Sequence, residues 1–170
     1  MKKIILLFIC LLGMLTTHAQ KFAFIDMEYI MENIPAYQKA NEELNLLSQQ
    51  YQKAIEAKAK EAETLYMAYQ KNAGSLNASQ RTQKEEAIVA KEKEVAELRK
   101  RYFGPEGEMA QKQETLIAPI QDKIYEAVKQ ISQQKGYDAV IDRASATSII
   151  FASPRIDISN DILSILGYSK

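Results

Sequence analysis

The sequence predicts an α+β protein in which a small β body carries a long antiparallel helical hairpin, that is, a coiled-coil arm. Two long segments repeat apolar residues at alternating spacings of three and four, the pattern by which helices pair. Short runs rich in β-branched and aromatic residues lie near both ends of the chain. From residue 20 onward the glycines fall between these segments rather than inside them, so they mark element boundaries.

The first residues have the layout of a secretory signal peptide. Lys2 and Lys3 precede an apolar run over residues 4–15, and Thr17-His18-Ala19 is a small-x-small cleavage site. We therefore expect residues 1–19 to be removed on secretion. No later segment is apolar over the ~18 residues that a membrane-spanning helix needs.

The composition after residue 19 excludes several kinds of active site. This part of the chain has no His, Cys or Trp, so it cannot form a cysteine nucleophile, a Ser-His-Asp triad, a disulfide or a Cys/His zinc site. It has no GxxxxGK[ST] loop for nucleotides either. Its 20 basic and 22 acidic residues give a net charge of −2, which does not favour nucleic acid as a partner. We expect no enzyme activity, no cofactor and no metal.

The first half of this region predicts one strand and one long helix. Residues 22–26 read Phe-Ala-Phe-Ile-Asp, a short β-type run. Residues 27–71 are helical in pattern, and Pro35 allows only a local start or a kink there. A turn follows at residues 72–77.

The returning segment predicts two helices separated by a break. Asn77 and Gln80 have the spacing of a reciprocal capping box, and the helix then runs to Tyr102. Residues 103–107, Phe-Gly-Pro-Glu-Gly, interrupt it. A further helix over residues 108–135 contains Pro119, which predicts a bend, and ends at Gly136.

The last part predicts a hairpin and a helix. Residues 137–142 and 148–152 are β-branched and aromatic runs, and residues 144–147 join them at hairpin length. Ser159 is the expected cap of a short helix that ends at Leu166.

Paired helices leave a seam of apolar residues along each partner. The outbound seam consists of Ile30, Ile34, Tyr37, Leu44, Tyr51, Ile55, Ala62, Leu65 and Tyr69, with Lys58 as an exception, and the returning seam of Ile88, Val95, Leu98, Tyr102 and Met109. At 1.5 Å per residue, the arm is about 50 Å long. We expect one domain over residues 20–170, with body and arm base at 20–35 and 108–170, the arm at 36–107 and its tip near 72–78.

The predicted body is too small to be stable alone. Three short strands and one short helix bury little apolar surface, and open strand edges need a partner. Self-association through the strands is the economical solution. We interpret the alternating strand residues as body core and subunit contact: Phe22, Phe24, Val140, Ile149 and Phe151.

The order of these elements resembles the Skp/OmpH family of periplasmic chaperones. The residues that carry the resemblance are the signal peptide, Phe-Ala-Phe-Ile-Asp at 22–26, the long hairpin, Gly-Tyr-Asp-Ala-Val-Ile-Asp at 136–142 and the strand-plus-helix end. It covers the whole of residues 20–170, and the break at 103–107 is similar to the Bacteroidetes-type members. The resemblance implies a Skp-like homotrimer in the periplasm, in which three arms surround a cavity.

The resemblance further implies an ATP-independent holdase. Unfolded outer-membrane proteins would be held in the cavity and delivered to the outer-membrane assembly machinery. Apolar residues off the seam are the candidate client contacts, because exposed aromatic and methionine side chains adapt to varied partners. They are Leu47, Tyr66, Met67, Val89 and Phe103. The alternative function is a structural coiled-coil tether or adaptor of the cell envelope.

Charge separates this chain from the strongly basic members of the family. Residues 36–102 carry 12 basic and 10 acidic residues. We interpret the run Arg99-Lys100-Arg101 as a solvated face paired with Glu94 and Glu97. Electrostatic capture of clients, or of anionic lipid, is left open. The acidic pairs near Asp26 and Asp142 are interpreted as groups at strand ends and helix starts rather than as catalytic carboxylates.

Overall fold

The computed structural model describes residues 20–146 and 148–168, and the chain divides into two compact units. We call residues 31–123 the arm unit, and residues 20–30 with 124–168 the body unit. Helix α5 (Glu108–Lys135) contributes to both. The predicted signal peptide, residues 1–19, lies outside the described residues.

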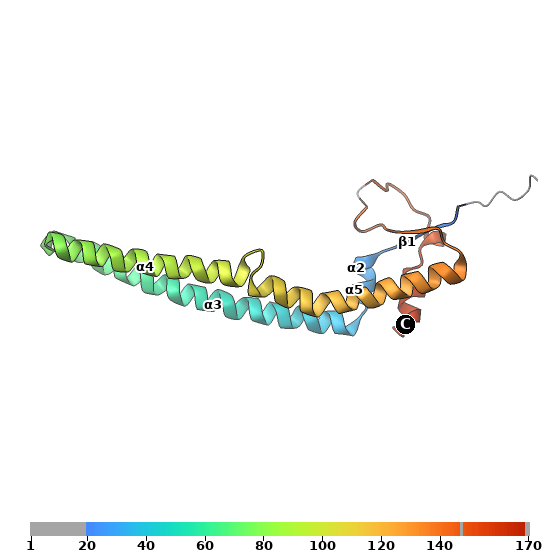
Figure 1. Cartoon of the computed structure of the whole chain (residues 1–170), viewed down its shortest axis with the longest axis horizontal. Helices are drawn as coiled ribbons and strands as arrows, with labels where there is room; N and C mark the ends of the chain where they lie inside the picture. The colour runs from blue at the N-terminus through green and yellow to red at the C-terminus, as the bar shows by residue number, and fades with distance from the viewer. Residues whose placement is uncertain (1–19, 147, 169–170) are drawn as a thin grey trace, which may run out of the picture. The chain divides into compact units, whose positions relative to one another are not determined.

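The arm unit is an antiparallel helical pair, as predicted. Helix α3 (Pro35–Asn72) runs out, and α4 (Ala78–Phe103) returns along it (Figure 1). The predicted outbound helix is divided, because α2 (Met27–Glu32) ends before α3 begins. Ile34 between them is extended, with φ −97° and ψ 115°. Proline clashes with a helical preceding residue, so Pro35 starts a new helix instead of kinking the first.

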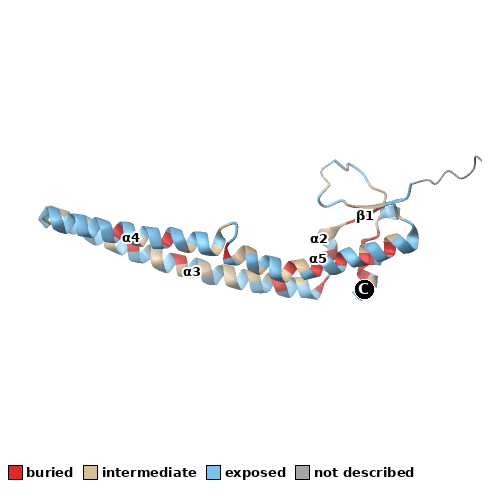
Figure 2. Cartoon of the chain, in the orientation of Figure 1, coloured by how far each residue is buried: buried red, intermediate tan, exposed pale blue. Residues whose placement is uncertain are grey.

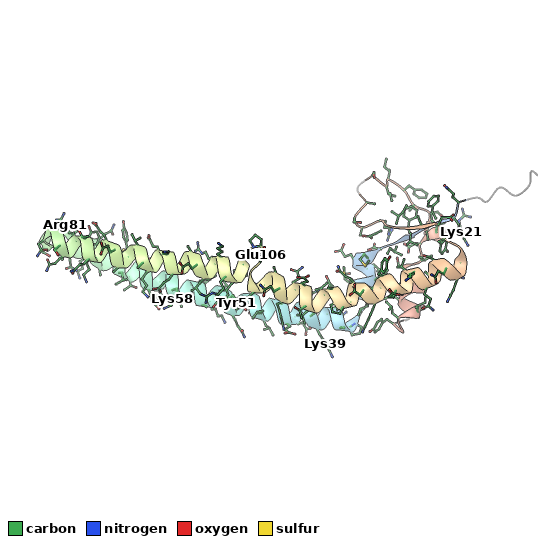
Figure 3. All side chains as sticks on the ribbon, in the orientation of Figure 1. Lys21, Lys39, Tyr51, Lys58, Arg81 and Glu106 are labelled. Atoms are coloured by element: carbon green, nitrogen blue, oxygen red, sulfur yellow. The ribbon has the colours of Figure 1, made fainter. Side chains whose placement is uncertain are left out.

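The turn between α3 and α4 is closed by side-chain hydrogen bonds. It is a short 3₁₀ helix, η1 (Ala73–Ser75). The predicted capping box is confirmed: the amide of Gln80 donates to the Asn77 side chain over 2.9 Å, and the amide of Asn77 donates to the Gln80 side chain over 3.0 Å. Arg81, labelled at the end of the hairpin in Figure 3, donates to the Ala73 carbonyl over 2.8 Å. The arm tip is therefore an ordered turn.

The predicted seam is confirmed along α3 and α4, whereas Ile30, which was predicted as its first residue, lies in α2 and belongs to the body unit. Buried positions recur along the two helices (Figure 2), and they include Ile55 and Ala62 on α3 and Ile88 and Val95 on α4. The remaining predicted seam residues are buried or half-buried. Because each helix contributes one narrow stripe, the arm has a seam but no wider core.

The body unit contains a two-stranded parallel sheet. Strand β1 (Phe22–Ile25) pairs with β2 (Ala139–Asp142), with Phe22 opposite Ala139. Helix α5 precedes β2 in the chain and ends at Lys135. The next residue, Gly136, has φ +68°, the left-handed conformation that glycine adopts without strain. The 3₁₀ helix η2 (Pro154–Ile156) and α6 (Ser159–Ile165) complete the unit.

The predicted hairpin is wrong. The partner of β2 is β1, more than a hundred residues away in the chain, and residues 148–152 form no strand. The signal for a hairpin was only local: two β-type runs at a short spacing. Ile150 and Phe151 are almost fully exposed, so this segment leaves apolar side chains uncovered within one chain.

The body core is built from aliphatic residues, not from the predicted aromatic ones. In β1 the buried residues are Ala23 and Ile25, so the alternation is present but the inward face is the opposite of the one predicted from Phe22 and Phe24. The prediction came from the alternation of residues along the strand, which does not by itself show which of the two faces is buried. The core of the unit comprises Ala23, Ile25, Ile30, Ile124, Ala127, Ile131, Ile158, Ile162 and Leu163.

Ser159 has a different role from the predicted helix cap. Residue Ile158 is the N-cap of α6 and makes no side-chain cap. The buried Ser159 hydroxyl accepts a hydrogen bond from the Asp26 amide over 2.9 Å and donates to Asp157 over 2.6 Å. Arg143 contacts the carboxylates of Asp26 and Asp157 at 3.0 and 3.6 Å. Three segments of the body are joined by this network.

A second carboxylate, Asp142, ties the end of β2 to the start of α2. Its Oδ1 accepts from the amide of Met27 over 3.2 Å and from that of Ala144 over 3.1 Å. Partial burial raises the pKa of Asp142, but hydrogen bonds from Ser145 and these amides outweigh it and hold the pKa below its usual value.

We expect the body unit to lose stability in acid as Asp142 becomes protonated. Because the pKa of Asp142 is lower in the folded state, its charge stabilises the fold at pH values above the unfolded-state pKa of ~3.9. This stabilisation is lost as the pH falls through the folded-state pKa. Asp142→Asn should therefore lower the free energy of unfolding at pH 7 more than at pH 3, measured by urea denaturation. The surface variant Asp122→Asn is the control and should stay within about 0.5 kcal/mol at pH 7. Equal losses for Asp142→Asn at both pH values would contradict the assignment.

Candidate functional site

The arm exposes apolar side chains outside its seam. Four of the five residues predicted to contact clients are well exposed. The exposed fraction is 47% for Tyr66, 59% for Met67, 61% for Val89 and 43% for Phe103. The fifth, Leu47, is half-buried, and its neighbour Leu46 is the exposed residue, at 62%. The spacing to the seam could have shown this, because Leu47 lies three residues after Leu44 and so beside the seam. Leu46 points further away from it.

An aromatic cluster lies beside the break in the returning segment. The rings of Tyr51 and Tyr102 stack with centroids 3.9 Å apart, and Phe103 meets Tyr51 edge-on at 6.2 Å. The Tyr51 hydroxyl donates to Glu108 over 2.5 Å. This hydrogen bond to a carboxylate, with partial desolvation, raises the pKa of Tyr51 to about 12. Tyr51 on α3 therefore contacts residues on both sides of the break.

The break itself is shaped by two glycines. The amide of Gly104 bonds to the Lys100 carbonyl and ends α4, and the amide of Gly107 bonds to the Gly104 carbonyl. A Cβ on Gly104 would lie 2.3 Å from the Lys100 oxygen, far inside van der Waals contact. Because the backbone of Lys100 comes this close to residue 104, only glycine fits at this position. Glu106, labelled in Figure 3, lies on the loop that projects from the arm at this point.

The basic run beside the break is not paired as predicted. Among the described residues, Arg99, Lys100 and Arg101 make no ion pair. Glu94 instead pairs with Lys91 at 2.8 Å, and Glu97 with Lys93 at 4.0 Å. Successive helix residues point about 100° apart, so this run is not one basic patch either.

The residues predicted as body core and subunit contact are not buried within the single chain. Phe22 and Phe151 are exposed, and Phe24, Val140 and Ile149 are half-buried. Phe151 has 81% of its surface exposed. A small unit that leaves such side chains uncovered has apolar area available for association.

The carboxylates of the body make structural hydrogen bonds and ion pairs. Asp26 accepts from the Tyr29 amide over 2.9 Å and contacts Arg143, and Asp142 accepts backbone amides. Over residues 20–146 and 148–168, no cluster of three or more His, Cys, Asp or Glu is placed to bind a metal ion. In the same part of the chain, no helix combines the length and apolar character that crossing a membrane requires.

Comparisons with known proteins agree with this fold. The family model described as "Outer membrane protein (OmpH-like)" matches residues 21–166. The "Chaperone protein Skp" of Yersinia enterocolitica is 24% identical over 148 residues, which cover 87% of each chain. The crystal structure of an OmpH-like protein from Caulobacter crescentus CB15 superposes with a TM-score of 0.65 at 11% identity, and the match covers 87% of this chain and 84% of that one.

Proposed function

We propose that this chain, which belongs to the OmpH-like outer membrane protein family, is an ATP-independent holdase for unfolded outer-membrane proteins in the periplasm. A chaperone role holds at the level of the family, which is not a family of enzymes. The finer assignment is our own, and it rests on the surface of the arm.

The single observation that carries the proposal is the exposure of Tyr66, Met67, Val89 and Phe103 on a two-helix arm. A seam residue that packs between helices has no apolar surface left for a partner, whereas these four have. Each such contact is weak, so an unfolded client can be held without being forced into one structure. Methionine and aromatic side chains suit this use because they adapt to different partners.

A trimer would complete the proposed holdase. Three chains joined through the exposed body residues would bring three arms around one cavity, and the client would lie between them. Release would follow when the outer-membrane assembly machinery binds the client more tightly. Secretion by the signal peptide at residues 1–19 would place the protein in the periplasm.

The alternative, a structural tether of the envelope, calls for a specific docking patch and not for diffuse apolar exposure. The test is dilution of a urea-unfolded β-barrel protein into buffer with and without this protein, followed by light scattering in the absence of ATP. We expect aggregation to be suppressed at about one trimer per client. Unchanged aggregation would favour the tether.

We expect apolar contact to contribute more to client capture than charge does. The segment 36–102 is nearly balanced, and exposed charges are screened over about 8 Å at physiological ionic strength. Client affinity should therefore fall less than about tenfold between 50 and 500 mM salt, or about 1.4 kcal/mol. Fluorescence titration with a labelled client at each salt concentration measures this.

A pair of triple variants is the matched control for the salt series. Changing Tyr66, Met67 and Phe103 to Ser should weaken client binding more than changing Arg99, Lys100 and Arg101 to Gln. The helical content of both variants is checked by circular dichroism. A steep salt dependence, or the opposite ranking of the two variants, would show that charge dominates.

A further inference from the structure

The two flanks of the arm seam differ in a way that selects a binding face. On one flank, Lys58 pairs with Glu61 at 3.0 Å, Lys91 pairs with Glu61 at 3.3 Å, and Lys91 pairs with Glu94 at 2.8 Å. These hydrogen bonds from Lys58 and Lys91 hold the pKa of Glu61 below its usual value. The chain of ion pairs crosses from α3 to α4 and covers that flank with charged groups.

The other flank is open and apolar. An open groove of about 570 Å³ lies there, and Ala59, Ala62 and Tyr66 on α3 and Val95 and Ala96 on α4 line it. This volume falls within the range of about 300–1,000 Å³ that is typical of ligand sites. Gln70 donates to the Tyr66 hydroxyl over 2.8 Å, which holds the ring at one end of the groove.

Spacing along the helices shows that the groove belongs to a longer stripe. Val89, Ala96 and Phe103 are seven residues apart on α4, so they share one face over four turns. On α3, Ala59 and Tyr66 are also seven apart, and each follows a seam position. Glu61, in contrast, precedes a seam position, and so it lies on the opposite flank. We call Ala59, Tyr66, Val89, Ala96 and Phe103 the groove face.

The rim of the groove also carries charged groups. Glu63, Glu92 and Arg99 line it, and none of the three makes an ion pair among the described residues. The two carboxylates can accept hydrogen bonds and the guanidinium of Arg99 can donate them. This combination suits a polypeptide backbone, which presents both N–H and C=O groups along its edges. An anionic lipid headgroup would meet two carboxylates and only one cation. The charge of the rim therefore favours a peptide over a lipid.

Groove length suits an extended peptide. From Ala59 to Tyr66 the helix rises about 10 Å, at 1.5 Å per residue. Alternate residues of an extended chain are about 6.6 Å apart and point to the same side. Two alternate apolar side chains therefore fit along the groove, while the residue between them faces the solvent.

We propose that the groove face of the arm binds an extended segment of unfolded polypeptide whose apolar residues occur at alternate positions. The inference rests on the proposed holdase function and deepens it. It assigns Tyr66, Val89 and Phe103 to one contact surface. Met67 and Leu47 lie on other faces, so the client contacts proposed for them are outside this surface.

Cysteine protection tests the face directly. The sole cysteine of the full chain, Cys10, is changed to Ser, and Ala96→Cys or Ala90→Cys is added. Both new thiols are on exposed positions of α4, but residue 90 lies off the groove face. With a cysteine-free unfolded β-barrel client at about five times its Kd, mass action leaves about one sixth of the sites free. Alkylation by N-ethylmaleimide should then slow about sixfold in the Ala96→Cys protein and remain unchanged in the Ala90→Cys protein.

Light scattering on the same samples separates the possible outcomes. Suppressed aggregation with selective protection of the thiol at position 96 supports the face. If aggregation is suppressed but the two thiols are protected equally, or the one at position 90 more, the face is wrong and the holdase remains. If aggregation is not suppressed, both the holdase and the face fail.

Short peptides and vesicles, each added in the absence of client, test the identity of the occupant. A capped peptide with apolar residues at alternate positions should protect the thiol of the Ala96→Cys protein from alkylation. A peptide of the same composition with apolar residues at spacings of three and four should protect it less. Equal protection by the two peptides, or stronger protection by vesicles of anionic phospholipid, would overturn the proposed occupant.

Discussion

Removal of residues 56–97 is expected to abolish client protection and leave the assembled body intact. Ile55 and Leu98 lie one turn beyond the stacked pair Tyr51–Tyr102, so a short glycine-containing turn can join them with the aromatic cluster preserved. The deletion takes away three buried seam residues, Ala62, Ile88 and Val95, and no buried residue of the body unit. Because most of the exposed apolar surface of the arm goes with it, light scattering of a diluted client should rise as fast as without chaperone.

The shortened protein must first be shown to be folded. Circular dichroism should show the loss of the 37 α-helical residues that the deletion removes, 17 from α3 and 20 from α4, with a cooperative thermal transition remaining. Sedimentation should show the same number of subunits as the intact protein. If this folded protein protected clients as well as the full-length chain, the arm would not be the holding surface.

Phe151→Asp is expected to dissociate the protein into monomers. Phe151 is 81% exposed in the single chain, so a change to Asp should cost almost nothing in an isolated monomer. In a trimer held through the body, the same side chain would be buried, and an unpaired carboxylate there costs several kcal/mol per subunit. Sedimentation equilibrium at micromolar concentration therefore distinguishes the two cases.

Met67→Asp is the matched control, because Met67 is also an exposed apolar residue but lies on the arm unit. It should leave the proposed trimer unchanged. A Phe151→Asp protein with the mass of the wild type would rule out this side chain as a subunit contact. A wild-type protein that is already a well-folded monomer would rule out the trimer itself.

The sequence alone was sufficient to predict the pairing of the two arm helices. Heptad spacing, the Asn77–Gln80 cap and the glycines of the break are local signals, and each depends on residues at most a few turns apart in the chain. The exposed side chains Tyr66 and Phe103 could be named from their distance to the seam. Local rules work here because a two-helix arm has almost no contacts other than those along its own seam.

The body required the tertiary structure. The pairing of β1 with β2 joins residues more than a hundred positions apart, and no local spacing favours it over the expected hairpin at 148–152. Which face of β1 is buried depends on the aliphatic core rather than on side-chain size, so Ala23 is inside and Phe22 outside. The asymmetry of the arm flanks was likewise invisible in the composition. It arises because Lys91 of α4 reaches Glu61 of α3 on one flank, while alanines leave the other open. Local sequence patterns determine the long helices, but only the packed chain decides which residues from distant segments meet.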